Sequence, residues 1–160
     1  MHDPRAIANE FIKLGRKNNS PLTLMQILKL SYIAHGFSLA FLDRPLSNSG
    51  PEAWGYGPVF PEVYHSLKFH GDQPVTEVIA KIEINNENLL SPIEEKFSSE
   101  ESQVIDFVYN NYGQLSGHEL SELTHKEGTP WKNAWNGGYG QWGITISNLE
   151  IKKHFKMLFE

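Results

Sequence analysis

Hydrophobic positions divide the chain into helical segments separated by turn-rich connections. The longest apolar pattern starts after Thr23 and repeats every three to four residues as far as Phe41, as expected for an α-helix. Thr23 and Gln26 are spaced as a capping box, in which each side chain satisfies a backbone N–H group of the first turn. The apolar stripe is wide, so we expect this helix to be central and contacted from more than one side. Lys29 lies within the stripe; we expect its stem to pack while its ammonium group reaches water or a carboxylate.

Shorter amphipathic segments flank this helix. Asp3 followed by Pro4 indicates a helix start. Ser98, Ser116 and Ser147 each precede a glutamate by three residues, which is again the capping-box spacing. Helices are therefore predicted from Pro4 to about Gly15, from Thr23 to Leu42, from Pro61 to about Gly71, from Ser98 to Gly113, from Ser116 through Leu123, for one turn from Thr129, and from Ser147 to Phe159.

Two connections carry a different pattern. Apolar residues alternate from Val78 to Ile84, which predicts a strand; Asn85–Asn86 is a predicted turn, and residues 88–90 are a predicted short return strand. Residues 43–51 are rich in turn formers and are expected to be loop. The predicted fold class is α+β, predominantly α-helical, as a single compact domain over residues 1–160 with a small β element.

Composition excludes several classes of protein. The 160 residues carry a net charge of −5 with only 14 Lys and Arg, so nucleic-acid binding by this chain alone is disfavoured. No apolar run approaches the ~20 residues of a membrane span. There is no cysteine, and therefore no disulfide, thiolate nucleophile or cysteine-based zinc site. A cytoplasmic location is expected.

An aromatic block around Trp54, Tyr56, Gly57 and Pro58 is the most informative stretch for function. It is typical of a kinked connection that anchors Trp54 and Tyr56 on the core, with Gly57 supplying unusual backbone angles. It is equally typical of a rigid surface element, because Trp and Tyr are frequent hot spots of protein interfaces. Both readings can hold, since a tyrosine can bury its ring and still direct its hydroxyl outward.

Metal and catalytic motifs are weak. His118, Glu122 and His125 share one helical face and could bind a metal for hydrolysis, but the spacing is not His-Glu-x-x-His, and a polar helical face is the commoner explanation. We expect His125 to fix the connection to Trp131 through a hydrogen bond. Residues 137–140 form a glycine-rich loop without the ending of a phosphate-binding loop. No enzyme signature is found, and no metal or cofactor is expected.

The last amphipathic segment allows two interpretations. Ile151, Phe155, Leu158 and Phe159 are expected to face inward and close the core. Alternatively, Phe155 and Phe159 are exposed and dock on a partner. The core interpretation is favoured.

The chain resembles the Panacea domain family, which includes SocA-like antitoxins and phage-associated GepA-like proteins. The resemblance covers nearly the whole chain in order. Gly55 departs from the pattern, because a larger, often basic residue is expected between Trp54 and Tyr56. The matching motifs are Leu28-Lys29-Leu30-Ser31-Tyr32-Ile33-Ala34, Pro45-Leu46, Glu52-Ala53-Trp54-x-Tyr56-Gly57-Pro58-Val59-x-Pro61-x-Val63-Tyr64, Tyr112-Gly113-x-Leu115-Ser116 and Glu119-Leu120-Ser121-x-Leu123-Thr124-His125-x-Glu127-x-x-Pro130-Trp131.

The resemblance implies an antitoxin that neutralises a cognate protein toxin by direct binding. It also implies, less generally, an adaptor that delivers the toxin to an ATP-dependent protease. Two other readings remain: a metal-dependent hydrolase that uses the histidine pair, and a transcriptional autoregulator, which the acidic charge disfavours. The residues expected to bind the partner or shape its surface are Trp54, Tyr56, Gly57, Pro58, Tyr64, His125 and Trp131.

Overall fold

The fold is built around one long helix, α2 (Leu24–Leu42), which buries fourteen of its nineteen residues. The computed structural model describes residues 1–84, 89–135 and 143–159. The other helices are α1 (Pro4–Lys17), α3 (Pro61–Leu67) with the following 3₁₀ turn η1 (Lys68–His70), α4 (Ser99–Tyr112), α5 (Gly117–His125), α6 (Pro130–Trp135) and α7 (Asn148–Met157). The strands are β1 (Glu52–Trp54), β2 (Gly57–Val59), β3 (Ala80–Glu83), β4 (Leu89–Pro92) and β5 (Ile144–Thr145).

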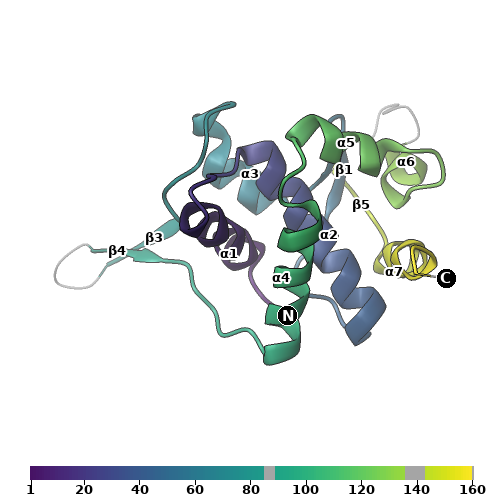
Figure 1. The fold of residues 1–160 in the computed structure, drawn as a ribbon, viewed down its shortest axis with the longest axis horizontal. Helices are drawn as coiled ribbons and strands as arrows, with labels where there is room; N and C mark the ends of the chain where they lie inside the picture. The colour runs from purple at the N-terminus through teal and green to yellow at the C-terminus, as the bar shows by residue number, and fades with distance from the viewer. Residues whose placement is uncertain (85–88, 136–142, 160) are drawn as a thin grey trace.

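Helices α1, α4, α5 and α7 surround α2, as Figure 1 shows. The predictions of a central helix contacted from several sides and of a mostly helical α+β fold are confirmed. None of the helices in the described ranges has the length and apolar content needed to cross a bilayer.

Local capping signals predicted the helix starts well. The capping box of Thr23 and Gln26 at the start of α2 is present in both directions, as are those of Ser98 at α4 and Ser116 at α5. Asp3 caps α1 by accepting from the Arg5 backbone N–H group. Such caps depend only on residues within one turn, which explains why the sequence alone locates them.

The aromatic block is a β-hairpin, which the sequence analysis did not predict. Strands β1 and β2 pair antiparallel with Trp54 opposite Gly57, and β5 adds to the other edge of β1. Pro58 is tolerated because β2 is an edge strand, where a missing N–H donor breaks no ladder on the outer side. The strands have two or three residues and β5 comes some ninety residues later, so no periodic pattern reveals them.

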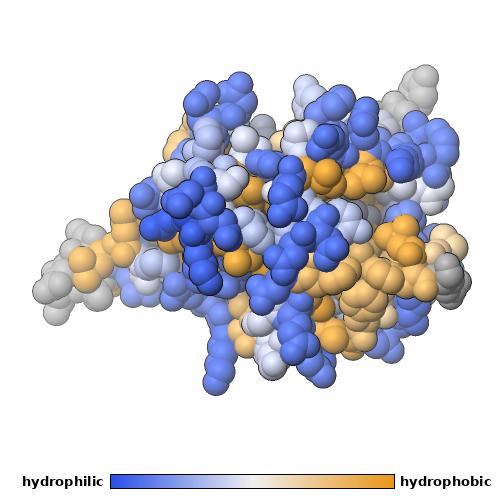
Figure 2. Space-filling view, in the orientation of Figure 1, coloured by the Kyte–Doolittle hydropathy of each residue, from blue (hydrophilic) through white to orange (hydrophobic). Residues whose placement is uncertain are grey.

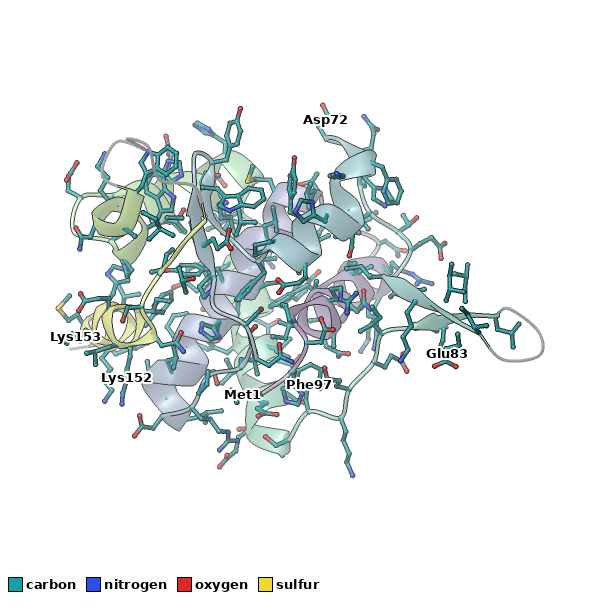
Figure 3. All side chains as sticks on the ribbon, turned by 180° about the vertical axis from the view of Figure 1, so that it is seen from behind. Met1, Asp72, Glu83, Phe97, Lys152 and Lys153 are labelled. Carbon is teal, nitrogen blue, oxygen red and sulfur yellow. The ribbon has the colours of Figure 1, made fainter. Side chains whose placement is uncertain are left out.

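The predicted β element between residues 75 and 90 is confirmed as the β3–β4 hairpin, which projects from the body beside α1 (Figure 1). We call this hairpin the arm. Every residue of β3 is exposed, including Ile82, and Ile84, Leu89 and Leu90 are exposed beside it. Figure 2 shows hydrophobic colouring along the arm, and Figure 3 labels Glu83 there. The predicted turn at Asn85–Asn86 lies outside the described residues, as does the glycine-rich loop at 137–140.

The C-terminal helix α7 packs closely along α2. A Cβ atom at Gly36 would lie 2.3 Å from the Phe155 ring, so only glycine permits this approach. Ile151 and Phe155 are buried as predicted, but Leu158 and Phe159 are 52% and 55% exposed, so the inward assignment of these two was wrong. They follow the last residue of α7. The Phe159 ring still contacts the rings of Phe37 and Phe41 of α2, so it lies at the exposed edge of the core and not inside it.

The N-terminal residues are held by contacts with distant segments. The His2 ring is hydrogen bonded to Glu101 at 2.8 Å and packs on Phe97, while its backbone N–H donates to the Leu46 carbonyl. Figure 3 labels Met1 and Phe97 in this region. The start of α1 is thereby tied to α4 and to the loop before β1.

Candidate functional site

The structure gathers the seven predicted surface residues into one neighbourhood at the β1–β2 hairpin. The Trp54 ring meets Tyr64 of α3 edge-on at 5.0 Å. The Trp131 indole Nε1–H donates to the Trp54 carbonyl at 2.7 Å, and the His125 ring stacks on Trp131 with centroids 4.0 Å apart. The hairpin that carries Tyr56 is therefore braced from α3, α5 and α6.

The members of this cluster differ strongly in exposure. Trp131, Gly57 and Pro58 are buried, whereas Trp54, Tyr64 and His125 are partly buried. Tyr56, in the two-residue turn of the hairpin, is 77% exposed. The others position the hairpin, and Tyr56 is the side chain that a partner can reach most fully.

His125 does not play the structural role expected from the sequence. The connection from α5 to α6 is held by Thr129, whose hydroxyl donates toward the carbonyls of Thr124 and Lys126. His125 contributes by stacking on Trp131 instead. Its Nε2 atom is buried without a hydrogen-bond partner among the described residues.

Lys29 belongs to this site, although the sequence did not place it among the site residues. Its side chain is fully buried, and its Nζ donates to the Pro58 carbonyl over a long 3.4 Å. The expectation that its ammonium reaches water or a carboxylate was therefore wrong. Burial lowers the pKa of Lys29 to about 7. Burial also lowers the pKa of His125; hydrogen bonding with a Tyr56 backbone group opposes this shift, and the charges of Lys29 and Lys132 add to it.

A cavity of about 260 Å³ opens beside Lys29, between α2 and the hairpin. Its walls are almost entirely apolar and include Leu28, Trp54, Val59 and Tyr64. Asp72, labelled in Figure 3, is exposed on its lining. The one buried cation of the described chain thus faces a hydrophobic hollow covered by the aromatic hairpin.

The histidine-based metal reading finds no geometric support. His118 forms an exposed pair with Glu122 at 3.2 Å, while the His125 ring is stacked on Trp131. Across residues 1–84, 89–135 and 143–159, no group of three or more His, Cys, Asp or Glu side chains is arranged to hold a metal ion.

The fold and site define a small, mostly helical α+β protein that presents a braced aromatic hairpin. The chain belongs to the family described as "Antitoxin SocA-like, Panacea domain", whose model matches residues 27–132. It is 30% identical over 158 residues to Antitoxin SocA of Caulobacter vibrioides, a match that covers 96% of this chain and 82% of that protein. No solved structure matches the chain. The family supports an antitoxin role, and the matched region includes the hairpin, Lys29 and His125.

Proposed function

We propose that this chain neutralises a cognate protein toxin in the cytoplasm by binding it directly, with the surface around Tyr56 as the interface. Membership of the antitoxin family supports a toxin partner. The observation that carries the choice of surface is Tyr56, a large side chain that is 77% exposed on a hairpin braced from three helices. A rigid aromatic anchor loses little conformational entropy on binding, which is the usual property of an interface hot spot.

The proposed interface needs more than one side chain. A stable protein complex buries on the order of 1,600 Å² in total, or roughly 800 Å² on each partner. The hollow next to the hairpin, lined by Met25, Tyr56, His118, Ser121 and His125, continues the surface from Tyr56 onto α5. Trp54 and Tyr64 pack against each other beside this surface. Their substitution should therefore weaken binding by changing the shape of the hairpin.

The arm is the rival interface, because Ile82 and Leu90 are 68% and 71% exposed there. The test is co-expression with the toxin, followed by pull-down and a binding measurement. Tyr56→Ala is expected to weaken the complex at least tenfold, about 1.4 kcal/mol or more, without changing the unfolding transition. Leu149→Ala is the control, since Leu149 is 60% exposed on α7.

The outcomes separate the two parts of the proposal. If Tyr56→Ala binds normally while Leu90→Ala does not, the interface lies on the arm and the assignment to Tyr56 is wrong. If the unsubstituted chain neither binds the toxin nor relieves its toxicity, direct neutralisation is wrong.

We further propose delivery of the toxin to an ATP-dependent protease as an extension of the same binding. The toxin's half-life is measured in cells with and without this chain. A half-life that is unchanged by the chain, in the presence of a stable complex, contradicts the adaptor role and leaves sequestration in place.

A further inference from the structure

Two nitrogen atoms converge on one point under the aromatic hairpin. A Cβ atom at Gly57 would lie 2.8 Å from Lys29 Nζ and 3.1 Å from His125 Nε2. Gly57 has a φ of 113°, a conformation that strains any other residue, so the position stays without a side chain. A side chain at this position would overlap Lys29, so the Gly57 backbone lies directly against the ends of the lysine and histidine side chains.

Neither nitrogen is well satisfied by the described residues. Lys29 has only the 3.4 Å contact with the Pro58 carbonyl, and no described carboxylate forms an ion pair with it. His125 Nε2 has no hydrogen-bond partner among those residues. Burying an ammonium without a counter-charge, or a hydrogen-bonding nitrogen without a partner, is unfavourable for folding. Such a pair is unfavourable for stability alone and well suited to receive an anion.

The surroundings restrict the kind of anion. The cavity of about 260 Å³ beside Lys29 has nearly apolar walls, formed in part by Leu28, Val59 and Tyr64. Apolar walls favour a hydrocarbon stem, and one ammonium matches one negative charge. A phosphate ester, with up to two charges and three acceptor oxygens, would need more donors than this site offers.

We propose that this cavity binds a carboxylate carried on a short apolar stem, with the ammonium of Lys29, which lines the cavity, as its ion-pair partner. An acidic side chain of a protein partner and a free small carboxylic acid share this chemistry. The partner source rests on the proposed function, whereas binding of a free acid is a property of this chain alone.

Binding is coupled to the charge of Lys29. The carboxylate binds the protonated lysine, so affinity falls about tenfold for each pH unit above the Lys29 pKa of about 7. Besides the titratable rings of Tyr56, Tyr64 and His125, the charged or titratable groups near the site are Asp72 on the cavity lining and His118, Glu122 and Lys126 on the neighbouring hollow. These last four are exposed, so solvent screens them more than it screens Lys29.

The test uses butyrate and its uncharged counterpart butyramide as probes of the isolated, isotope-labelled chain. Nuclear magnetic resonance follows the Gly57 amide and the Lys29 Cε signal during each titration at pH 6.5. Butyrate is expected to give saturable shifts and to bind at least tenfold more tightly than butyramide. At pH 8.5 its affinity should fall at least tenfold. Lys29→Met should abolish the preference for butyrate, while Lys153→Met, at an exposed lysine of α7, should retain it.

Equal binding of both probes, or no saturable shift with butyrate, overturns the proposal. The comparison of probes needs no substitution, so it stands even if Lys29→Met does not fold. A second experiment identifies the source: Lys29→Met should weaken the toxin complex at least tenfold. If the chain binds butyrate and Lys29→Met binds toxin normally, the ligand is a small acid. If no toxin complex forms at all, the proposed function is wrong. The butyrate titration still tests whether the cavity binds a carboxylate.

Discussion

Two buried titratable side chains of α2, His35 and Lys29, are held in opposite ways. His35 is fully buried with both ring nitrogens satisfied: Nε2 is 2.8 Å from Asn148 Oδ1, and Nδ1 accepts from the Ser47 backbone N–H. Because Nδ1 is the acceptor, the proton is on Nε2, which donates to Asn148. The neutral His35 ring, with one donor and one acceptor nitrogen, therefore matches these two hydrogen-bond partners. Lys29 has no comparable set of partners, so one residue stabilises the fold and the other destabilises it.

Acidification should destabilise the protein through His35. Burial lowers its pKa from 6.5 to about 4, so between these values the unfolded chain binds a proton that the folded chain does not. The free energy of unfolding should therefore fall as the pH decreases from 6.5 to 4, by up to about 1.4 kcal/mol per pH unit. Urea denaturation at pH 7, 6 and 5 measures this, with His118→Gln as the exposed control. A His35 ring that titrates near pH 6.5 by nuclear magnetic resonance would contradict it.

Replacing Lys29 should stabilise the protein in a pH-dependent way. Its pKa of about 7 lies below the ordinary value of 10.5, so the unfolded chain binds the extra proton between these values and wild-type stability rises with pH. Lys29→Met removes the buried charge and should add about 1–4 kcal/mol at pH 7. This gain should shrink by up to about 1.4 kcal/mol per pH unit as the pH is raised to 9.5. The measurement is denaturation of both proteins at pH 7, 8 and 9; a constant difference, as expected for Lys153→Met, would refute the pKa shift.

At the scale of elements, one buried polar side chain joins the base of the arm to α1. Asn9 of α1 is fully buried, its Nδ2 donates to the carbonyls of Ile79 and Ile93, and its Oδ1 accepts from the Ile79 N–H. These two isoleucines flank β3 and β4 at the base of the arm. These hydrogen bonds fix the base of the arm, whereas the exposed side chains of β3 do not pack against the body.

Loss of this fastening should release the arm. Asn9→Ala leaves three buried backbone groups without partners and should cost on the order of 3 kcal/mol. Amide hydrogen exchange at Ile79 and Ile93 should accelerate more than at the centre of α2. Asn110→Ala, at an exposed position of α4, should change stability by no more than about 0.5 kcal/mol. Unchanged exchange at the two isoleucines would show that the arm has another attachment.

Elements defined by local chemistry were predictable, and those defined by distant pairing were not. The capping boxes at Thr23, Ser98 and Ser116 mark helix starts because the interacting groups lie within one turn. The sheet β2-β1-β5 gave no such signal, since its strands are too short for a pattern and one of them follows ninety residues later. The burial of Leu158 and Phe159 was overestimated because a helical pattern does not state where the helix ends, and α7 ends at Met157.

The candidate site was predictable only in part, for the same reason. Resemblance to the family selected Trp54, Tyr56 and Trp131, which the structure brings together. Lys29 lies within the apolar stripe of α2, which the sequence shows. Its burial, however, results from Gly57 and Pro58 of the hairpin, which pack over it. The burial of a side chain depends on every element that packs around it, so it cannot be predicted from the pattern of one helix.

At the scale of the whole molecule, one cluster of buried residues extends from α1 to α7 and includes residues from both ends of the chain. Ile7 and Phe11 represent its N-terminal part, and Ile151 and Phe155 its C-terminal part. The family match ends at residue 132, so β5 and α7 lie beyond it although they complete the sheet and cover α2. The site depends on this later segment, because β5 pairs with the strand that carries Trp54.

The dependence of β1 on β5 and of α2 on α7 has a consequence during synthesis. A ribosome delivers residues 24–54 long before residues 144–157, so the nascent chain must wait with the edge of β1 unpaired and the groove at Gly36 open. Until α7 emerges, the apolar surface of α2 that Phe155 covers in the folded protein is exposed to chaperones and proteases. Each new copy therefore passes through an interval, set by translation, in which this apolar surface is exposed and prone to aggregation.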